Sequence, residues 1–334
     1  MLRLHFTAGD LARTRVADGP DPLWESVLSL HRLRETRPEP LLSGWREHVL
    51  RQAAAPLPFL LPLVPSRGYF PDFLTPAEGA YGFETGLDAL LSTPHGQLRG
   101  QVEKLGEDRP LTPWLRAVRE GRAASLHRLG DALRAYQDAA LGTWWQRIMA
   151  RVESDRTMRA RTQWARGTEA MLRTFEPVLR WRAPVLEAEY PVDRDVHLEG
   201  RGLLLIPSYF CRTKPVALAD PSLPPTLVYP ARSSVPRARP LTELGGRHLA
   251  RLLGPTRAAV LQSLDGDCTT SELARRAGVS LSSASEHASV LRGAGLVSSS
   301  RQRNSVRHAL TPIGLALLDG HPGLPDPTEK ACEA

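Results

Sequence analysis

Between residues 21 and 175 the apolar side chains recur mostly at spacings of three and four positions, the period of one face of an α-helix. The residues that show the spacing best are Leu23, Val27, Leu30 and Leu33, then Leu115, Val118, Leu126, Leu129 and Leu133, then Trp144, Trp145, Ile148 and Val152. The pattern predicts that this part of the chain is mostly helical.

One segment, residues 54–76, interrupts the helical pattern. It holds too many prolines for the interior of a helix, because proline lacks the backbone N–H that a helix needs. It also holds too many large apolar groups for a solvated linker. We expect an ordered loop that packs on the helices.

Beyond Pro184 the period changes to that of strands. Short apolar or alternating runs, bounded by glycine and proline, occupy residues 185–190, 195–198, 203–206 and 226–229. We expect them to form a small antiparallel sheet. Together with the helices this predicts an N-terminal α+β domain that is rich in helix.

The domain boundary is predicted in residues 231–240, which carry Arg232, Arg237, Arg239 and two prolines and have little to bury. The predicted organisation is an N-terminal domain over residues 1–235 and a second domain over residues 241–319. Residues 320–334 include three prolines, so we expect a disordered tail there.

Residues 241–318 have the rhythm of a winged helix-turn-helix. A helix over residues 255–264 leads into an Asp-Gly-Asp turn at 265–267. Thr269 and Glu272 then have the spacing of a capping box, in which each side chain accepts from the other residue's backbone N–H. This box predicts the start of a helix over residues 271–277.

The next helix is the predicted recognition helix. Gly278 supplies a tight turn, Ser280 is a good N-cap, and the helix runs over residues 281–293. Its inner face would carry Ala284, Ala288 and Leu291. Its outer face would carry Ser282, Ser283, Ser285, Glu286 and Ser289. Serine suits a helix that lies close to a phosphate backbone, because its small hydroxyl donates without holding the groove walls apart.

After this helix, residues 297–310 predict two strands around a turn at residues 302–304. Arg301, Arg303 and Arg307 lie at or beside the tip of that hairpin. A basic hairpin beside a recognition helix is a wing, which reaches phosphates or the adjacent minor groove.

Composition changes this picture little. The net charge of +7 invites the inference of a nucleic-acid partner, but only Lys104, Lys214 and Lys330 among the 43 basic residues are lysine. A GC-rich genome explains such an arginine excess without any polyanion. Charge therefore counts as support for DNA binding only where it lies along a motif, as it does in the wing.

The remaining composition indicates an ordinary globular protein. Apolar residues make up 42% and charged residues 24%, and no apolar run is long enough for a membrane span or a signal peptide. Three cysteines at wide spacings suit a reducing compartment and form no disulfide framework. We expect a cytoplasmic protein that binds no membrane.

A family resemblance rests on the C-terminal quarter. The stretches Val279-Ser280, Ser285-Glu-His287 and Val290–Val297, the arginine-rich wing and Leu310–Gly314 together resemble the DNA-binding domain of ArsR-type bacterial transcriptional regulators. The first two thirds also resemble a domain of unknown function that precedes this winged helix in some regulators, through residues 68–76, 200–208 and 227–230. The resemblance implies repressor-like operator binding as a homodimer.

The chain departs from the family's metal sensors. These carry a Cys-x-Cys pair in the helix that here spans residues 271–277, which holds no thiol. Cys268 precedes that helix as a lone thiol, which cannot complete a tetrahedral site. Asp319-x-His321 resembles half of another metal site, but no partnering ligands follow. We expect no metal and no cofactor.

Two motif residues allow two interpretations each. The position of Glu286 is usually basic or amide-bearing in the family, so its carboxylate either accepts from a cytosine amine or faces solvent. His287 either contacts phosphate or supports the wing.

The N-terminal domain shows no catalytic signature. Cys211, beside an arginine, is either a redox sensor or a buried structural residue, and the buried interpretation is favoured. The large aromatic residues of this domain either line a ligand pocket or form ordinary core, and the core interpretation is favoured. These residues are Tyr136, Trp144, Trp145, Trp164, Phe175 and Trp181.

These observations predict a transcriptional regulator rather than an enzyme: a repressor that binds a two-fold operator in double-stranded DNA as a homodimer. The N-terminal domain would sense an unknown signal, such as a small-molecule effector. The predicted DNA contacts are Ser282, Ser283, Ser285, Glu286, His287, Ser289, Arg301, Arg303 and Arg307. The alternative is an enzyme or a protein-interaction domain fused to a DNA-binding module.

Overall fold

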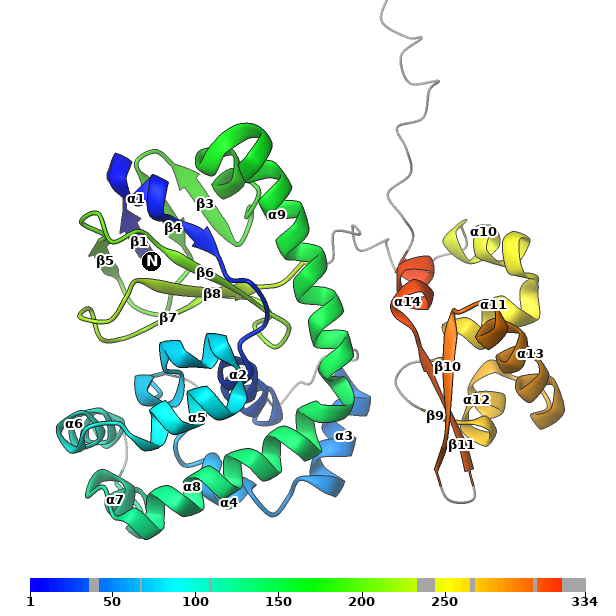
Figure 1. Ribbon diagram of the computed structural model, residues 1–334, viewed down its shortest axis with the longest axis horizontal. Helices are drawn as coiled ribbons and strands as arrows, with labels where there is room; N and C mark the ends of the chain where they lie inside the picture. Colours follow the sequence, from blue (N-terminus) through cyan, green and yellow to red (C-terminus); the bar gives the residue numbers. More distant parts are fainter. Residues whose placement is uncertain are drawn as a thin grey trace, which may run out of the picture. The chain divides into compact units, whose positions relative to one another are not determined.

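The chain divides into two compact units, Met1–Arg232 and Ser233–Ala334 (Figure 1). The computed structural model describes residues 1–35, 42–66, 68–107, 110–232, 244–264, 268–302 and 305–319. The predicted linker beyond residue 232, the turn at 265–267, Arg303, His321 and the predicted tail lie outside the described residues. The predicted α+β class, with a helix-turn-helix at its C-terminal end, is confirmed.

Helices make up most of the N-terminal unit. Many begin at a sequence signal; α2, for example, starts after Asp21, whose carboxylate accepts from the backbone N–H groups of Leu23 and Trp24. The helices are α1 (Ala8–Arg13), α2 (Pro22–Leu33), α3 (Ser43–Gln52), α4 (Leu57–Leu60), α5 (Phe83–Leu91), α6 (His95–Leu105), α7 (Pro113–Arg119), α8 (Ala123–Tyr136) and α9 (Trp145–Arg173). Shorter helical turns are η2 (Asp72–Leu74), η3 (Ala77–Tyr81), η4 (Gln137–Leu141) and η5 (Gly142–Trp144).

The strands of this unit form two four-stranded sheets. The first has the order β3-β4-β1-β5, and its strands are β1 (Leu2–His5), β3 (Leu179–Arg182), β4 (Val185–Ala188) and β5 (Arg194–His197). The second has the order β2-β6-β8-β7, and its strands are β2 (Arg15–Val16), β6 (Leu204–Ser208), β7 (Val216–Ala217) and β8 (Thr226–Pro230). Figure 1 shows the strands gathered at one end of the unit and α4 to α8 at the other.

The expectation of one small antiparallel sheet needs correction. Both sheets are mixed: β1 pairs parallel with β5, and β6 pairs parallel with both β2 and β8. Two of the parallel pairs involve β1 and β2, which come from the start of the chain and are joined to β5 and β6 by the whole helical region. The third pair, β6 and β8, is joined by residues 209–225, a crossover rather than a hairpin turn.

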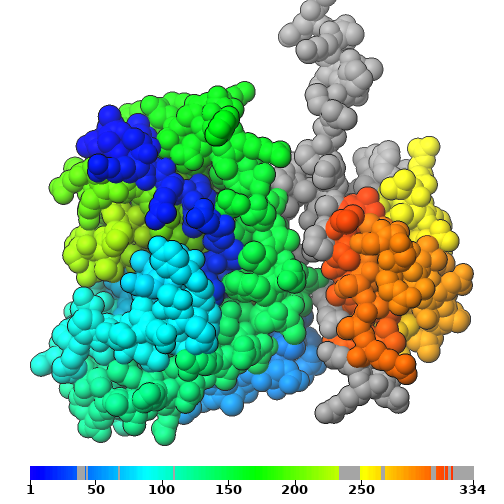
Figure 2. Space-filling model, in the orientation of Figure 1, coloured from blue at the N-terminus to red at the C-terminus, as the bar shows by residue number. Residues whose placement is uncertain are grey.

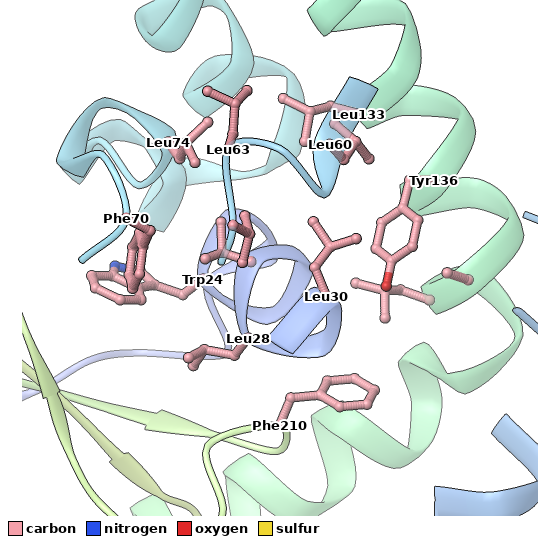
Figure 3. Packing of buried hydrophobic residues seen from close by; sticks show 14 of the residues in the cluster. Trp24, Leu28, Leu30, Leu60, Leu63, Phe70, Leu74, Leu133, Tyr136 and Phe210 are labelled. Carbon is pink, nitrogen blue, oxygen red and sulfur yellow. The ribbon is translucent and has the colours of Figure 1, made fainter. Parts of the chain in front are cut away.

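The larger core surrounds α2 (Figure 3). Around this helix, Leu60 and Leu63 come from the proline-rich segment, Tyr136 from α8, and Phe210 from the loop after β6 (Figure 3). The prediction that residues 54–76 pack on the helices is confirmed, with α4 and η2 as short helical turns within the segment.

A second core is formed by side chains of both sheets and of the end of α9, and it accounts for part of the aromatic set. Tyr136, Phe175 and Trp181 are buried, and Trp144 and Trp145 pack against the larger core. For these residues the core interpretation is confirmed. Trp164 is different, since 95% of its surface is exposed, and it belongs to neither a core nor a pocket.

Buried carboxylates join the layers of the N-terminal unit. Glu25 on α2 accepts from Ser208 Oγ at 3.0 Å and from the backbone N–H groups of Tyr209 and Phe210 at 2.7 and 3.1 Å. Asp72 in η2 accepts from the N–H groups of Ala219 and Asp220. Each carboxylate thus fixes a loop that is distant in sequence.

The point where the chain leaves this unit is held by α9. Asp155 accepts from Tyr229 Oη at 2.6 Å, from Arg159 Nη2 at 3.2 Å and from the backbone N–H of Arg232 at 3.1 Å. One turn earlier, Arg151 Nε donates to the carbonyl of Ala231 at 3.0 Å. A buried ion pair and the last residues of the unit therefore share one carboxylate.

The C-terminal unit is a winged helix-turn-helix. Its helices are α10 (Leu244–Leu253), α11 (Pro255–Gln262), α12 (Thr270–Ala277), α13 (Leu281–Gly293) and α14 (Pro312–Asp319). Its sheet has the order β10-β11-β9, with β9 (Cys268–Thr269), β10 (Val297–Gln302) and β11 (Ser305–Leu310). A small core of Val260, Leu261, Leu273, Ala288 and Leu291 lies between the helices and the sheet.

Candidate nucleic-acid interface

The helix-turn-helix is set by local signals. Thr269 Oγ1 accepts from the N–H of Glu272, and the Glu272 carboxylate accepts from the N–H of Thr269, so the predicted capping box is present. Gly278 ends α12 with φ 66°, a left-handed conformation that glycine adopts without a steric penalty. Ser280 Oγ then accepts from the N–H of Ser283 and opens α13. Two helices therefore meet around a tight, specified turn.

The recognition helix α13 spans the predicted residues and buries the predicted face. Ala284, Ala288 and Leu291 have at most 1% of their surface exposed. Ser282, Glu286 and Ser289, at spacings of four and three, form a row along the middle of the exposed face. Ser285 lies beside this row and is exposed.

Two predicted contact residues lie on the flank of α13 instead. Ser283 and His287, four residues apart, are half-buried. The Nδ1 atom of His287 is buried without a hydrogen-bond partner. The burial of Nδ1 leaves only the rest of the ring accessible to a ligand.

Hydrogen bonds within α13 already involve several hydroxyls. Ser282 Oγ lies 3.0 Å from Ser280 Oγ, and Arg292 Nη2 donates to Ser289 Oγ at 3.3 Å. These bonds are exposed, so a phosphate or base edge that approached the helix would compete with them easily. The exposed row offers small donors around one central negative charge, that of Glu286.

The wing is the antiparallel pair of β10 and β11. Arg301 is exposed one residue before the end of β10. Arg307 is half-buried opposite Ser300, and β9 pairs with it on its other side. The N–H of Thr269 holds the pKa of Glu272 below its usual value, and the charges of Arg276 and Arg307 lower it further. Arg301 is thus the more accessible of the two cations.

Sequence reasoning missed two residues of this region. Leu281, the first residue of α13, leaves 55% of its surface exposed at the helix tip, where an apolar side chain suits a thymine methyl group. His308 is buried and joins three elements: Nε2 lies 2.9 Å from Thr270 Oγ1 and Nδ1 lies 2.8 Å from Ser299 Oγ. The position of Leu281 just after the N-cap Ser280 was an available signal, whereas His308 carried none.

The structure also bears on the candidate metal ligands, the cysteines and the question of a membrane span. Among the described residues, no group of three or more His, Cys, Asp or Glu side chains is arranged to hold a metal ion. Cys211 is buried, and burial raises the pKa of its thiol to about 12, which fits the structural interpretation rather than the redox sensor. Cys268 is also buried. In the described parts of the chain, no helix is long and apolar enough to span a membrane.

Comparison with known proteins bears on the C-terminal unit. Residues 252–299 match a family of helix-turn-helix domains. Over 72 residues, 21% of the chain, the sequence is 43% identical to the HTH-type transcriptional regulator CmtR of Mycobacterium bovis, and the Mycobacterium tuberculosis protein of that name gives the same figures. The match covers 58% of those proteins, so the chain spans little more than half the length of the curated relatives that it matches.

No solved structure matches the chain significantly. The family match covers α11 to α13 and the start of β10, and it includes the stretches 279–280, 285–287 and 290–297 on which the resemblance was based. Residues 252–299 of this chain therefore form an ArsR-like helix-turn-helix domain.

Proposed function

We propose that the protein is a DNA-binding transcriptional regulator that inserts α13 into the major groove. The observation that carries this proposal is the exposed row of Ser282, Glu286 and Ser289 on a helix held by the turn at Gly278. Side chains of this size allow the helix to approach base edges closely. Glu286, at the centre, accepts a hydrogen bond from a cytosine amine.

The wing supplies phosphate contacts in this proposal. Arg301 is exposed near the hairpin tip, and no acidic side chain lies directly opposite it in the register, where Val306 is its partner. In the space-filling view the recognition helix and hairpin lie on the surface of the C-terminal unit (Figure 2). A phosphate contact of this kind is independent of base sequence and weakens as salt rises.

A homodimer and a two-fold operator complete the proposal. Leu252 on α10 and Ile313 on α14 leave 69% and 65% of their surfaces exposed, and a second copy would cover apolar groups of this kind. Two recognition helices would then enter successive major grooves about one helical turn apart. The protein acts as a repressor, and the N-terminal unit adjusts the affinity in response to a signal.

The N-terminal unit is assigned a sensing role rather than a catalytic one. The buried carboxylates of Glu25 and Asp72 accept hydrogen bonds from backbone N–H groups of nearby loops. Carboxylates engaged in this way hold distant loops in place, which supports a structural role for them.

The first test uses Arg301→Ala on an operator identified by genome-wide mapping of bound DNA. Affinity for specific and random DNA should fall alike, and the slope of log K against log salt should become shallower by about 0.9 for each phosphate that the variant no longer neutralises. Arg180→Ala, an exposed arginine of β3, is the control with the same charge change. Weaker binding at one base position with an intact salt slope would show that the wing reads sequence.

The second test uses Glu286→Gln. If Glu286 accepts from a cytosine amine, discrimination at one base pair should fall by about 1–3 kcal/mol while affinity for other sites changes little. Uniformly tighter binding to all DNA would show instead that Glu286 only repels phosphates. Ser271→Ala, an exposed serine of α12, is the control for the preparation.

A further inference from the structure

A cavity of about 550 Å³ opens in the N-terminal unit, within the size range of small-molecule sites. One wall comes from the proline-rich segment, through Leu57, Pro58, Leu61 and Pro62. Pro110, Thr112 and, on α7, Leu115 also line the cavity. The walls are therefore mainly apolar, and their prolines make them stiff.

One charged side chain, Arg34, lines this cavity. It is half-buried at the C-terminal end of α2, and its Nη1 donates to the carbonyl of Leu61 at 2.7 Å and to that of Val64 at 3.2 Å. These bonds orient the guanidinium but do not neutralise it. Among the described residues no carboxylate forms an ion pair with Arg34, whereas its neighbour Arg32 pairs with Glu35.

A guanidinium that has no carboxylate partner in the described parts of the chain, at the edge of an apolar cavity, selects for one kind of ligand. An apolar body gains free energy by leaving water for the walls. A single anionic group accepts a charge-assisted hydrogen bond from the guanidinium nitrogens of Arg34. A dianion such as a phosphate monoester would bring a second charge that this one cation does not balance, and burying that charge is costly.

We propose that this cavity binds an apolar monocarboxylate, with its carboxylate at Arg34 and its hydrocarbon body between Leu61 and Leu115. The proposal concerns ligand binding by the N-terminal unit and does not depend on DNA binding. It also assigns a second role to residues 54–76, which form a wall of the cavity in addition to packing on the helices.

The first experiment measures binding to the full chain by titration calorimetry without DNA. The probes are decanoate, decanol and decylamine, which share a chain length and differ in head-group charge. Decanoate should bind about 10-fold or more tightly than either analogue, because only it forms the charged hydrogen bond. Equal affinity for decanoate and decanol, or no binding of decanoate, would overturn the proposal.

The second experiment locates the site with two variants. Arg34→Gln should weaken decanoate binding about 10-fold or more and bring it close to that of decanol. Arg116→Gln on α7 is the matched control, since Arg116 is exposed and does not line the cavity. It should bind decanoate as the unmodified chain does.

A second variant, Ala54→Trp, separates the loss of the ligand site from a folding defect of Arg34→Gln. Ala54 is exposed and lines the cavity, so a large side chain there fills the space without removing a hydrogen bond of Arg34. The variant should keep the thermal transition of the unmodified chain and lose decanoate binding. Unchanged decanoate affinity in a folded Ala54→Trp chain would place the ligand elsewhere and overturn the assignment.

Discussion

The two units of the chain hold themselves together in different ways. The N-terminal unit buries several charged side chains, which are Asp10, Asp21, Glu25, Asp72, Asp155 and Arg159. In the described part of the C-terminal unit, His308 is the only polar side chain that is buried. The first unit relies on hydrogen bonds between distant segments, whereas the second relies on a small apolar core and on caps within a few residues.

This difference has an energetic meaning. A buried carboxylate with backbone donors stabilises one arrangement of loops, but it leaves unpaired groups behind when it is removed. A helix cap contributes about 1 kcal/mol and affects little beyond its own helix. The N-terminal unit should therefore respond strongly to single polar substitutions and to pH, and the C-terminal unit weakly.

The largest expected effect comes from Asp155→Ala. Removal of this carboxylate leaves the buried guanidinium of Arg159 without its anion, and Tyr229 Oη and the N–H of Arg232 without their acceptor. Breaking a buried ion pair in this way costs about 3–5 kcal/mol. Hydrogen exchange read by mass spectrometry should show the loss in the N-terminal unit alone. Equal protection in the variant and the unmodified chain would contradict this account.

The pH dependence should differ between the units. Burial raises the pKa of Glu25 to about 7 and that of Asp21 to about 6. Because the folded state binds these protons more tightly than the unfolded state, the stability that the two groups contribute is fully present below their unfolded pKa values. It is lost as the pH rises through about 6 for Asp21 and about 7 for Glu25, by about 3 kcal/mol for Glu25. Denaturant unfolding across this range measures the effect.

Glu25→Gln is the control, and its stability should vary less with pH than that of the unmodified chain.

The stability of the C-terminal unit should change in the opposite direction in acid. The lowered pKa of Glu272 gives stability that is present above the usual carboxyl pKa and is lost as the pH falls through the folded value. Parallel pH profiles of the two units would contradict the comparison.

Thr269→Ala tests the cap of α12. It removes the side chain that accepts from the N–H of Glu272, so the C-terminal unit should lose about 1 kcal/mol of unfolding free energy. Hydrogen exchange in α12 should report the loss. Ser271→Ala on the same helix is the matched control, because Ser271 is exposed and lies outside the capping box. A larger loss from Ser271→Ala than from Thr269→Ala would refute the cap's role.

The smallest effect is expected at the thiols. Cys211 and Cys268 are buried, and burial raises the pKa of Cys211 to about 12. In a Cys332→Ser background, a disulfide reagent such as DTNB should therefore react slowly with the native chain and rapidly with the chain in denaturant. Rapid reaction of the native chain at Cys211 would restore the redox interpretation.

The two units also differed in how well the sequence predicted them. The bounds of α12 and α13 could be predicted because Ser280, Gly278 and the Thr269–Glu272 box act on neighbouring residues. The inward face of α13 followed from its period alone. The partial burial of Ser283 and His287 could not be predicted, since it depends on how neighbouring elements pack against that flank.

In the N-terminal unit the sequence indicated elements but not their partners. Leu2 pairs with Ala188 and Arg15 with Leu204, and no local pattern encodes such separations. Glutamate is a residue type that usually lies at the surface, and the burial of Glu25 depends on backbone N–H donors from the loop after β6. Trp164 is the reverse case, an apolar residue at helical spacing that the fold leaves in solvent.

The attachment of Ala231 and Arg232 to α9 has a mechanical consequence. A pull along the chain from beyond residue 232 would first load the bonds from Arg151 to Ala231 and from Arg232 to Asp155. The long helix, rather than the terminal strand β8 alone, would then bear the tension. Conversely, a displacement of α9 would move Arg151 and Asp155, and with them the point where the chain leaves this unit.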